Sequence, residues 1–388
     1  MAVMPYKNER EQKMNLRKLS LSCAFCLGAL IASPSTGHAA SGAFPNEYPG
    51  KIGTIDQIES VSNFCGTKPV KVALSDGMGG DSWRKITLAE FKDEAKKCPN
   101  ITEIRYTDGQ GNPQKQISDI QGLIAQQFNV ILVFPDSGAA LFRVMSQAMQ
   151  SGIAVVPYAI GENFPGTPGD QYITVTTESV QDEGATLAAW VVKNLGPNGG
   201  NVISLGGVPG NPLSINLVKG EESIFSKYPK VKLLAGPVDT NWDPAQTQRV
   251  MASLLAKYPK IDAVMGDYGL GSIGALRAFV AADRPIPLWA VQDANGLACF
   301  WQDHKAENPG FKLATTSSRN WIVRLALHKG LAAAEGISDA EPSVIDLPLY
   351  EDSTSSNPAM QPHCDRSLPP DALLSSHLTP QQLGALFK

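Results

Sequence analysis

A glycine-rich stretch near residue 80 carries residue types that could bind a small ligand. Val70–Ser75 is mostly apolar and suits a buried strand, and Gly77-Met-Gly-Gly80 follows it shortly before Trp83-Arg84. Glycine-rich loops between a strand and a helix often hold phosphate with their backbone N–H groups. This stretch lacks the Gly-Lys-Ser/Thr ending of a P-loop, and with it the lysine cation. We therefore expect Trp83 and Arg84 to face a neutral polar ligand.

A second glycine motif, Gly269-Leu-Gly-Ser-Ile-Gly274, matches the dinucleotide-binding pattern GxGxxG between a predicted strand and a predicted helix. Asp293 ends the next predicted strand, where an acid that binds ribose would stand. Against this reading, Asp267 and Tyr268 directly precede the first glycine, and a carboxylate there would repel a pyrophosphate. We therefore predict no dinucleotide, and no cofactor of any other kind.

Patterns of catalytic residues are sparse. The sequence contains no GxSxG and no HExxH motif. The histidines after residue 39, which are His304, His328, His363 and His377, do not stand at predicted strand ends. We expect no catalytic residue and no metal site, and an exported α/β enzyme that depends on Asp293 is the least favoured alternative.

Polar residues at the predicted strand ends define a candidate binding site, because open parallel sheets bind ligands at the carboxyl ends of their strands. Trp83 and Trp242 each follow a strand and precede a helix, one in each half of the chain. Two such rings could clasp the apolar C–H faces of a sugar ring, although each could instead pack against its own helix. The predicted ligand-binding residues are Asp76, Asp81, Trp83, Arg84, Asp136, Ser137, Asn216, Trp242, Tyr268, Asp293, Ser318, Asn320 and Trp321.

The length and the charge of the chain limit its class. It has 388 residues, which suits two domains, and its net charge of −4 gives no basic field for nucleic acid. Arg17-Lys18 precedes an apolar run at Leu19–Ala32, which is too short to span a bilayer and suits a signal peptide. We predict a signal peptide over residues 1–39, with cleavage near Ala39 and export of the mature chain.

Four cysteines remain after this cleavage: Cys65, Cys98, Cys299 and Cys364. An even number in an oxidising compartment indicates disulfides. Cys65 precedes the first strand and Cys98 ends the first helix, so both fall on the same side of one α/β unit. The predicted pairs are therefore Cys65–Cys98 and Cys299–Cys364, the second tying down the C-terminal segment, and four buried thiols are the alternative.

Short apolar runs alternate with amphipathic segments from Cys65 onwards, which predicts parallel sheets covered by helices on both faces. A break falls at residues 172–178, after a loop rich in Gly and Pro. The expected strands are Val70–Ser75, Ile101–Tyr106, Asn129–Phe134, Ile153–Pro157, Ile173–Thr176, Val202–Leu205, Val231–Ala235, Ile261–Met265, Ile286–Val291, Phe311–Thr315 and Val344–Leu347.

Three motifs in this order resemble the periplasmic solute-binding proteins of ribose and galactofuranose type, which feed ABC importers. They are GDSWR at Gly80–Arg84, IGALRAF at Ile273–Phe279 and WAVQDANG at Trp289–Gly296, and the resemblance extends over residues 71–347. It implies two Rossmann-like lobes that close on a solute by a hinge. It also implies that Trp83, Arg84, Trp242 and Asp293 contact the sugar.

The resemblance further implies a domain division. The N-terminal lobe would hold residues 66–176 and 318–345, the C-terminal lobe residues 177–317, and residues 346–388 would form an extension that packs on the lobes. Hinges would fall near Thr176-Thr177, Ser317-Ser318 and Asp346.

The chain departs from the family pattern at three positions that normally hold ring hydroxyls. Ala159-Ile160 replaces an Asp-Arg pair, Tyr268 replaces an Asn, and Leu217 replaces an Arg. The implied function is to bind a small carbohydrate-like solute and present it to the membrane subunits of an ABC importer, as a monomer. The alternatives are a periplasmic sensor for a receptor, or a binder of a polyol, nucleoside or aromatic solute.

Overall fold

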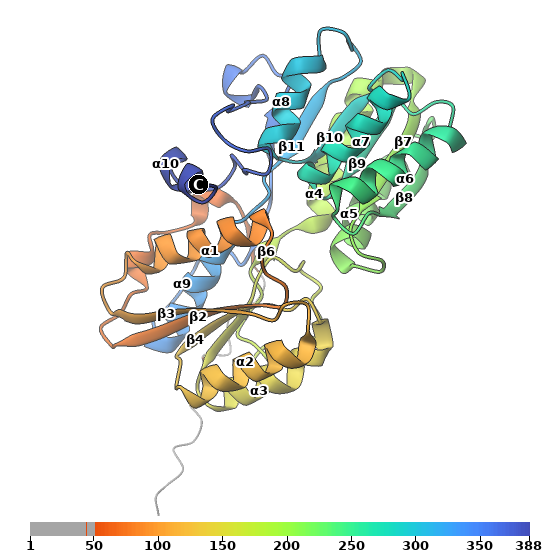
Figure 1. The fold of residues 1–388 in the computed structure, drawn as a ribbon. Coiled ribbons are helices and arrows are strands. Elements are labelled where there is room, and N and C mark those ends of the chain that lie inside the picture. The colour runs from red at the N-terminus through yellow and green to blue at the C-terminus, as the bar shows by residue number, and fades with distance from the viewer. Residues whose placement is uncertain (1–43, 45–50) are drawn as a thin grey trace, which may run out of the picture. The chain divides into compact units, whose positions relative to one another are not determined.

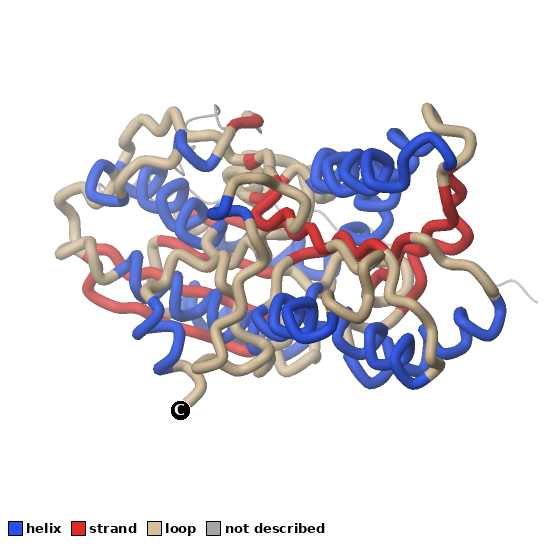
Figure 2. Tube along the Cα trace, turned by 90° about the horizontal axis from the view of Figure 1, so that it is seen from above, coloured by secondary structure: helices blue, strands red, loops and turns tan. Residues whose placement is uncertain are grey.

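The computed structural model of the chain describes Phe44 and residues 51–388 (Figure 1). The predicted signal peptide lies outside these residues. The described part contains two larger sheets with helices on both sides of the strands, as the view from above in Figure 2 also shows. Its short 3-10 helices are Ile55–Gln57, Val61–Asn63, Gly138–Leu141, Gly196–Asn198 and Pro358–Met360.

The first sheet has four parallel strands in the order β3-β2-β4-β5. Figure 1 shows α1 and α9 on one face of this sheet and α2 and α3 on the other. The strands are β2 (Val70–Asp76), β3 (Ile101–Asp108), β4 (Val130–Phe134) and β5 (Ala154–Pro157). The helices are α1 (Ser82–Ala95), α2 (Pro113–Ala125), α3 (Phe142–Gln150) and α9 (Ile322–Glu335).

The second sheet has six strands in the order β13-β11-β10-β9-β7-β8. Its strands are β7 (Gly200–Gly206), β8 (Val231–Asp239), β9 (Ala263–Gly266), β10 (Leu288–Gln292), β11 (Leu313–Thr316) and β13 (Leu349–Asp352). Its helices are α4 (Val180–Leu195), α5 (Pro212–Phe225), α6 (Pro244–Lys257), α7 (Gly269–Ala281) and α8 (Asn295–His304). All its pairings are parallel except that of β13 with β11, which is antiparallel.

Alternating side chains of the strands supply the cores on the two faces of the second sheet. Ala263 and Met265 of β9 pack with α4, whereas Val264 between them packs with α6 and α7. Successive residues of a strand point to opposite faces, so a strand covered on both sides must be apolar throughout. The near-continuous apolar runs of the sequence follow from this, and the predicted fold class is confirmed.

A small third sheet marks places where the chain passes between the two larger ones. It pairs β1 (Ile52–Gly53), β12 (Val344–Ile345) and β6 (Thr177–Glu178), all in parallel. The chain leaves the first sheet through β6, returns after β11 to α9, and leaves again after β12 to reach β13. The predicted strand at Ile173–Thr176 is wrong, because only Thr176 of that run forms a bridge.

Side-chain caps explain where several helices begin. The Asp81 carboxylate accepts a hydrogen bond from the backbone N–H of Arg84 at 2.8 Å, and Asp243 accepts one from Gln246 at 2.6 Å. Such caps satisfy N–H groups that have no partner within the helix. Pro244 follows Asp243 at the first helical position, where its missing N–H costs nothing.

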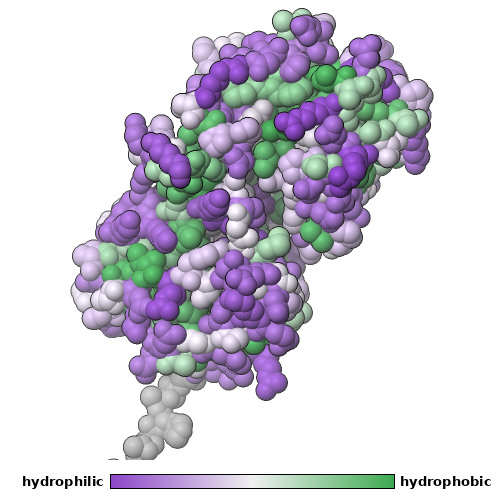
Figure 3. Space-filling model, viewed as in Figure 1, coloured by the Kyte–Doolittle hydropathy of each residue, from purple (hydrophilic) through white to green (hydrophobic). Residues whose placement is uncertain are grey.

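Both predicted disulfides are present, which rules out four free thiols. Cys65–Cys98 joins the segment before β2 to the turn after α1, and Cys299–Cys364 joins α8 to the C-terminal segment. That segment also contains α10 (Pro380–Ala385). The face drawn in Figure 3 is mostly polar, with apolar side chains in small patches. Between residues 51 and 388, no helix is both long and apolar enough to cross a bilayer.

Candidate functional site

Arg84 organises the carboxyl ends of the first sheet. Its guanidinium Nη1 lies 3.0 Å from Asp76 Oδ1 at the end of β2, and its Nη2 lies 3.0 Å from Asp136 Oδ1 after β4. The guanidinium carbon lies 3.7 Å from the centroid of the Phe134 ring, a cation–π contact. Arg84 is only 7% exposed, so these contacts within the chain use much of its capacity to donate.

Asp76 is fully buried and accepts two hydrogen bonds on Oδ1. One comes from Arg84, and the other comes from the Tyr158 hydroxyl at 2.6 Å. Burial raises the pKa of Asp76, although the charge of Arg84 opposes the rise. Burial lowers the pKa of Arg84, but the carboxylates of Asp76 and Asp136 outweigh this effect and raise it. Asp76 and Arg84 therefore form a buried ion pair that holds the first loop in place.

Two backbone N–H groups of the glycine-rich loop already donate to carboxylates of the chain itself. The backbone N–H of Met78 donates to Asp136 Oδ2 at 3.1 Å, and the N–H of Gly79 donates to Asp108 Oδ1 at 2.8 Å. These donors are the groups that would hold a phosphate. Asp81 acts as the cap of α1, and Ser137 is half-buried just before a 3-10 turn that its side chain does not cap.

Trp242 takes the corresponding place in the second sheet. Its indole N–H donates to Asp267 Oδ1 at 3.0 Å, and the Ser214 hydroxyl bonds the other oxygen of the same carboxylate. The ring lies against Gly207, where a Cβ would come within 2.0 Å of it. Burial raises the pKa of Asp267, and the hydrogen bonds from Ser214 and Trp242 oppose the rise. Trp242 is half-buried, and its orientation is set by this network.

Tyr268 and Asn216 have different surroundings. Tyr268 is half-buried before α7, and burial followed by the negative charges of Asp81 and Asp371 raises its pKa. These two charges come from the start of α1 and from the C-terminal segment. Asn216 is buried on α5, and its Oδ1 accepts a hydrogen bond from Lys219 at 3.2 Å.

Asp293 is engaged by the chain itself. It is 2% exposed, and its Oδ1 accepts from the backbone N–H of Ser318 and from the Ser375 hydroxyl, each at 2.7 Å. Its Oδ2 accepts from the backbone N–H of Ser375 at 3.0 Å. The Ser318 hydroxyl in turn donates a hydrogen bond to the backbone carbonyl of Asp293 at 2.8 Å.

The last two predicted residues are packed between helices. The Asn320 amide donates to the Trp83 carbonyl and to the Thr87 hydroxyl, each at 2.9 Å, and so joins the turn before α9 to α1. Trp321 is fully buried, and its indole N–H donates to the Ser317 hydroxyl at 3.1 Å. These contacts are structural, and a role of either residue in solute binding stays a prediction.

Sequence reasoning missed a buried charged group where the chain passes between the sheets. Arg319 has a left-handed backbone with φ of 53°, and its Nε lies 2.5 Å from Glu178 Oε1. Glu183 accepts hydrogen bonds from Thr316 and Gln292 at 2.6 and 3.2 Å, and burial raises its pKa to about 7 against the Arg319 charge. The sequence offered a signal for this group, because Arg319 directly follows Ser318, which was predicted to bind the ligand.

The donor set does not suggest a metal. Within the described residues, no three His, Cys, Asp or Glu side chains gather closely enough to hold an ion. The arrangement instead places tryptophan rings, hydroxyls and paired charges at strand ends of the two sheets. Such a set can stack on a small polar molecule and bond its hydroxyls.

Comparison with known proteins identifies the class. A family model described as "Periplasmic binding protein domain" matches residues 73–299, which is more than half of the chain, so the chain belongs to this family. It is 28% identical over 264 residues to the xylitol-binding protein of Mycolicibacterium smegmatis, covering 67% of this chain and 70% of that one.

Two further matches agree with this family. The ribose import binding protein RbsB of Salmonella typhimurium is 25% identical over 55% of this chain and 74% of its own length. The crystal structure of a galactofuranose-binding protein superposes with a TM-score of 0.63 at 20% identity, covering 73% of this chain and 94% of that one. The last match shows the fold, which is that of type I periplasmic binding proteins.

Proposed function

We propose that this chain is the solute-binding component of an ABC importer and that it binds a small sugar or polyol between its two lobes. One observation carries the proposal. Trp83 and Trp242 stand at the carboxyl-end loops of the two sheets, each is half-buried, and each indole N–H is held by an acceptor of the chain. Rings fixed in this way are preorganised to stack on the C–H faces of a sugar.

The chemistry around the two rings favours a neutral ligand with hydroxyls. Asp136, which bonds Arg84 beside the Trp83 ring, and Asp267, which accepts from Trp242, supply acceptors near the two rings. Asp76 and Glu178 balance the charges of Arg84 and Arg319. The relatives named for xylitol and ribose support the same ligand class. Since Ala159 and Leu217 are buried apolar residues where the family has polar ones, we favour a polyol or a less usual sugar over ribose.

Export fits this role. The predicted signal peptide at residues 1–39 and the two disulfides favour an oxidising compartment, and we infer the periplasm. The lobes would be residues 66–176 with 318–345, and residues 177–317, and they would close on the solute by a hinge. The closed form would then deliver the solute to the membrane subunits, without catalysis and as a monomer.

The test is a thermal-shift screen of the mature chain against sugars, polyols, sugar acids and nucleosides. A ligand at about 100 times its dissociation constant adds about 2.7 kcal/mol, which raises the melting temperature by several degrees. A single strong sugar or polyol hit, confirmed at one-to-one stoichiometry by calorimetry, is the expected result. A nucleoside or aromatic hit alone would replace the ligand class, and turnover of a hit would favour the enzyme.

The sensor alternative makes the same prediction for binding. It differs in the partner, which would be a receptor rather than importer subunits. Capture of membrane proteins by the solute-loaded chain distinguishes the two, because an importer complex includes an ATPase and a receptor complex does not.

A further inference from the structure

The C-terminal segment after Cys364 is fastened to the second lobe along α8. The Asn295 side-chain amide donates to the carbonyls of Asp365, Leu368 and Pro369, at 2.8 to 3.1 Å. The first backbone N–H groups of α8, those of Asn295 and Gly296, donate to the carbonyls of Ala372 and Pro370 at 2.9 and 2.8 Å. The segment therefore caps this helix, whose first N–H groups have no partner within it.

The same segment next donates hydrogen bonds to the Asp293 carboxylate. Ser375 bonds this carboxylate with its hydroxyl at 2.7 Å and with its backbone N–H at 3.0 Å, one to each oxygen. Its hydroxyl also lies 2.9 Å from that of Ser317. A serine hydroxyl on a buried carboxylate is the contact that a hydroxyl of the proposed solute would make.

From there the segment reaches helix α1 of the first lobe. The Ser82 hydroxyl bonds the Asp371 carboxylate, the backbone N–H of His377 donates to Glu90 Oε1 at 2.6 Å, and the Gln382 amide donates to Asp93 Oδ1 at 2.6 Å. These contacts lie along one side of α1, from its first turn to its last. We call residues 371–383 the strap.

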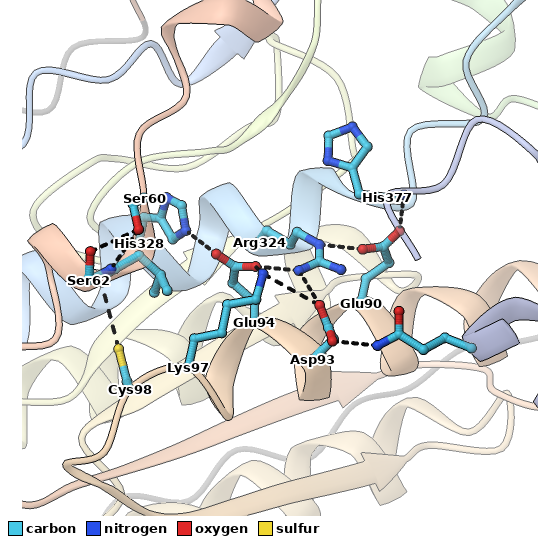
Figure 4. Close-up of polar contacts among 12 residues, drawn as sticks. Ser60, Ser62, Glu90, Asp93, Glu94, Lys97, Cys98, Arg324, His328 and His377 are labelled. Atoms are coloured by element: carbon cyan, nitrogen blue, oxygen red, sulfur yellow. Dashed lines mark hydrogen bonds and ion pairs between the residues drawn. The ribbon is translucent and has the colours of Figure 1, made fainter. Parts of the chain in front are cut away.

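The strap docks on a cluster of charges built from α1 and α9 (Figure 4). Arg324 bonds Glu90, Asp93 and Glu94 together, and Glu94 also bonds His328 at 3.1 Å. The His377 ring lies parallel to the Trp321 ring, with 5.1 Å between centroids. Glu90 thus accepts from the strap while Arg324 neutralises its charge.

Apolar side chains complete the contact. Ala372, Leu373, Leu378 and Leu383 are buried in a hydrophobic cluster that also contains Ile86 of α1 and Leu297 of α8. Burial of such side chains contributes about 25 cal/mol for each Å² removed from water. The strap therefore lies between the two lobes and contacts both.

We propose that the strap ties the two lobes together in the solute-free protein and limits how far they open. The tie does not depend on any solute. The consequence that Ser375 competes with a solute hydroxyl for Asp293 rests on the proposed function.

The experiment uses the mature chain without solute. Leu383→Asp places a carboxylate in the buried apolar cluster and should release the end of the strap. The double variant Ser82→Ala with Gln382→Ala removes two hydrogen bonds between the strap and α1, and it introduces no buried charge. Arg366→Ala is the matched control, because the exposed Arg366–Asp303 ion pair joins the same segment to α8 alone.

Small-angle X-ray scattering and hydrogen exchange give the readouts. We expect both release variants to have a larger radius of gyration and faster exchange at the amides of Ser375 and His377, while the control matches wild type. Circular dichroism establishes that each variant is folded, and the double variant decides the matter if Leu383→Asp is not. Fast exchange of these amides in wild type, or strap release without an increase in radius, would overturn the proposal. A thermal-shift screen without hits would refute the proposed solute and leave this result unaffected.

Discussion

The indole N–H of Trp83 lies 2.9 Å from the backbone carbonyl oxygen of Ser318 and donates a hydrogen bond to it. Trp83 stands in the first turn of α1, and Ser318 lies where the chain passes from the second sheet back to the first. The ring packs against both major hydrophobic clusters. One side chain therefore combines structural packing against two hydrophobic clusters with the aromatic face that we assign to the solute.

Substitution of Trp83 separates these two roles. Trp83→Ala should weaken solute binding by more than tenfold, because stacking contributes about 1–3 kcal/mol, and should also lower the free energy of unfolding. Trp83→Phe keeps an aromatic face and loses the hydrogen bond, which costs about 1 kcal/mol of stability, together with part of the ring's packing. Calorimetric titration with the identified solute and urea unfolding measure the two effects.

Trp242→Ala should also weaken binding by more than tenfold, for the same reason. The control is Tyr228→Ala, which removes an aromatic ring that is 48% exposed on the second lobe and has no predicted role. Unchanged affinity in both tryptophan variants would refute the aromatic clasp.

Arg84→Met should destabilise the protein by about 3–5 kcal/mol, because it leaves the buried Asp76 carboxylate without its partner. The double variant Arg84→Met with Asp76→Asn removes both charges and should recover part of the loss. Urea unfolding at pH 7 gives both values. A single variant as stable as wild type would show that the pair does not hold the first loop.

Glu221→Gln should change how stability depends on pH. Glu221 is fully buried and bonded to Ser204 at 2.9 Å, and burial raises its pKa from 4.5 to about 8. Between these pH values the folded state holds a proton that the unfolded state has lost, so this group's contribution to the free energy of unfolding is complete below pH 4.5 and is lost by about pH 8.

The variant cannot ionise, so its free energy of unfolding should fall less than that of wild type between pH 5 and pH 8. The difference should reach a few kcal/mol, at about 1.4 kcal/mol for each pKa unit. Urea titrations at the two pH values measure it. Glu222→Gln, at an exposed position next along α5, should keep the wild-type dependence, and equal slopes for wild type and Glu221→Gln would contradict the assignment.

Much of the fold could be predicted because its causes are local. Alternation along a strand decides which side chain meets which helix layer, as Val264 does between Ala263 and Met265. The cap at Asp243 and the following Pro244 act within one turn of α6. The antiparallel edge strand β13 was missed, because its partner β11 lies more than 30 residues earlier and its own sequence carries no such signal.

The sequence by itself determined the class of protein, the parallel strands, the helix starts and the two disulfides, because periodicity, caps and motif order act over short stretches. Only the tertiary structure decided what the polar residues bond. Asp293 looks free at a strand end until Ser375, 82 residues later, reaches it, and Trp83 meets Ser318 across 235 residues. Such bonds depend on how distant segments pack, and no local pattern of residues encodes them.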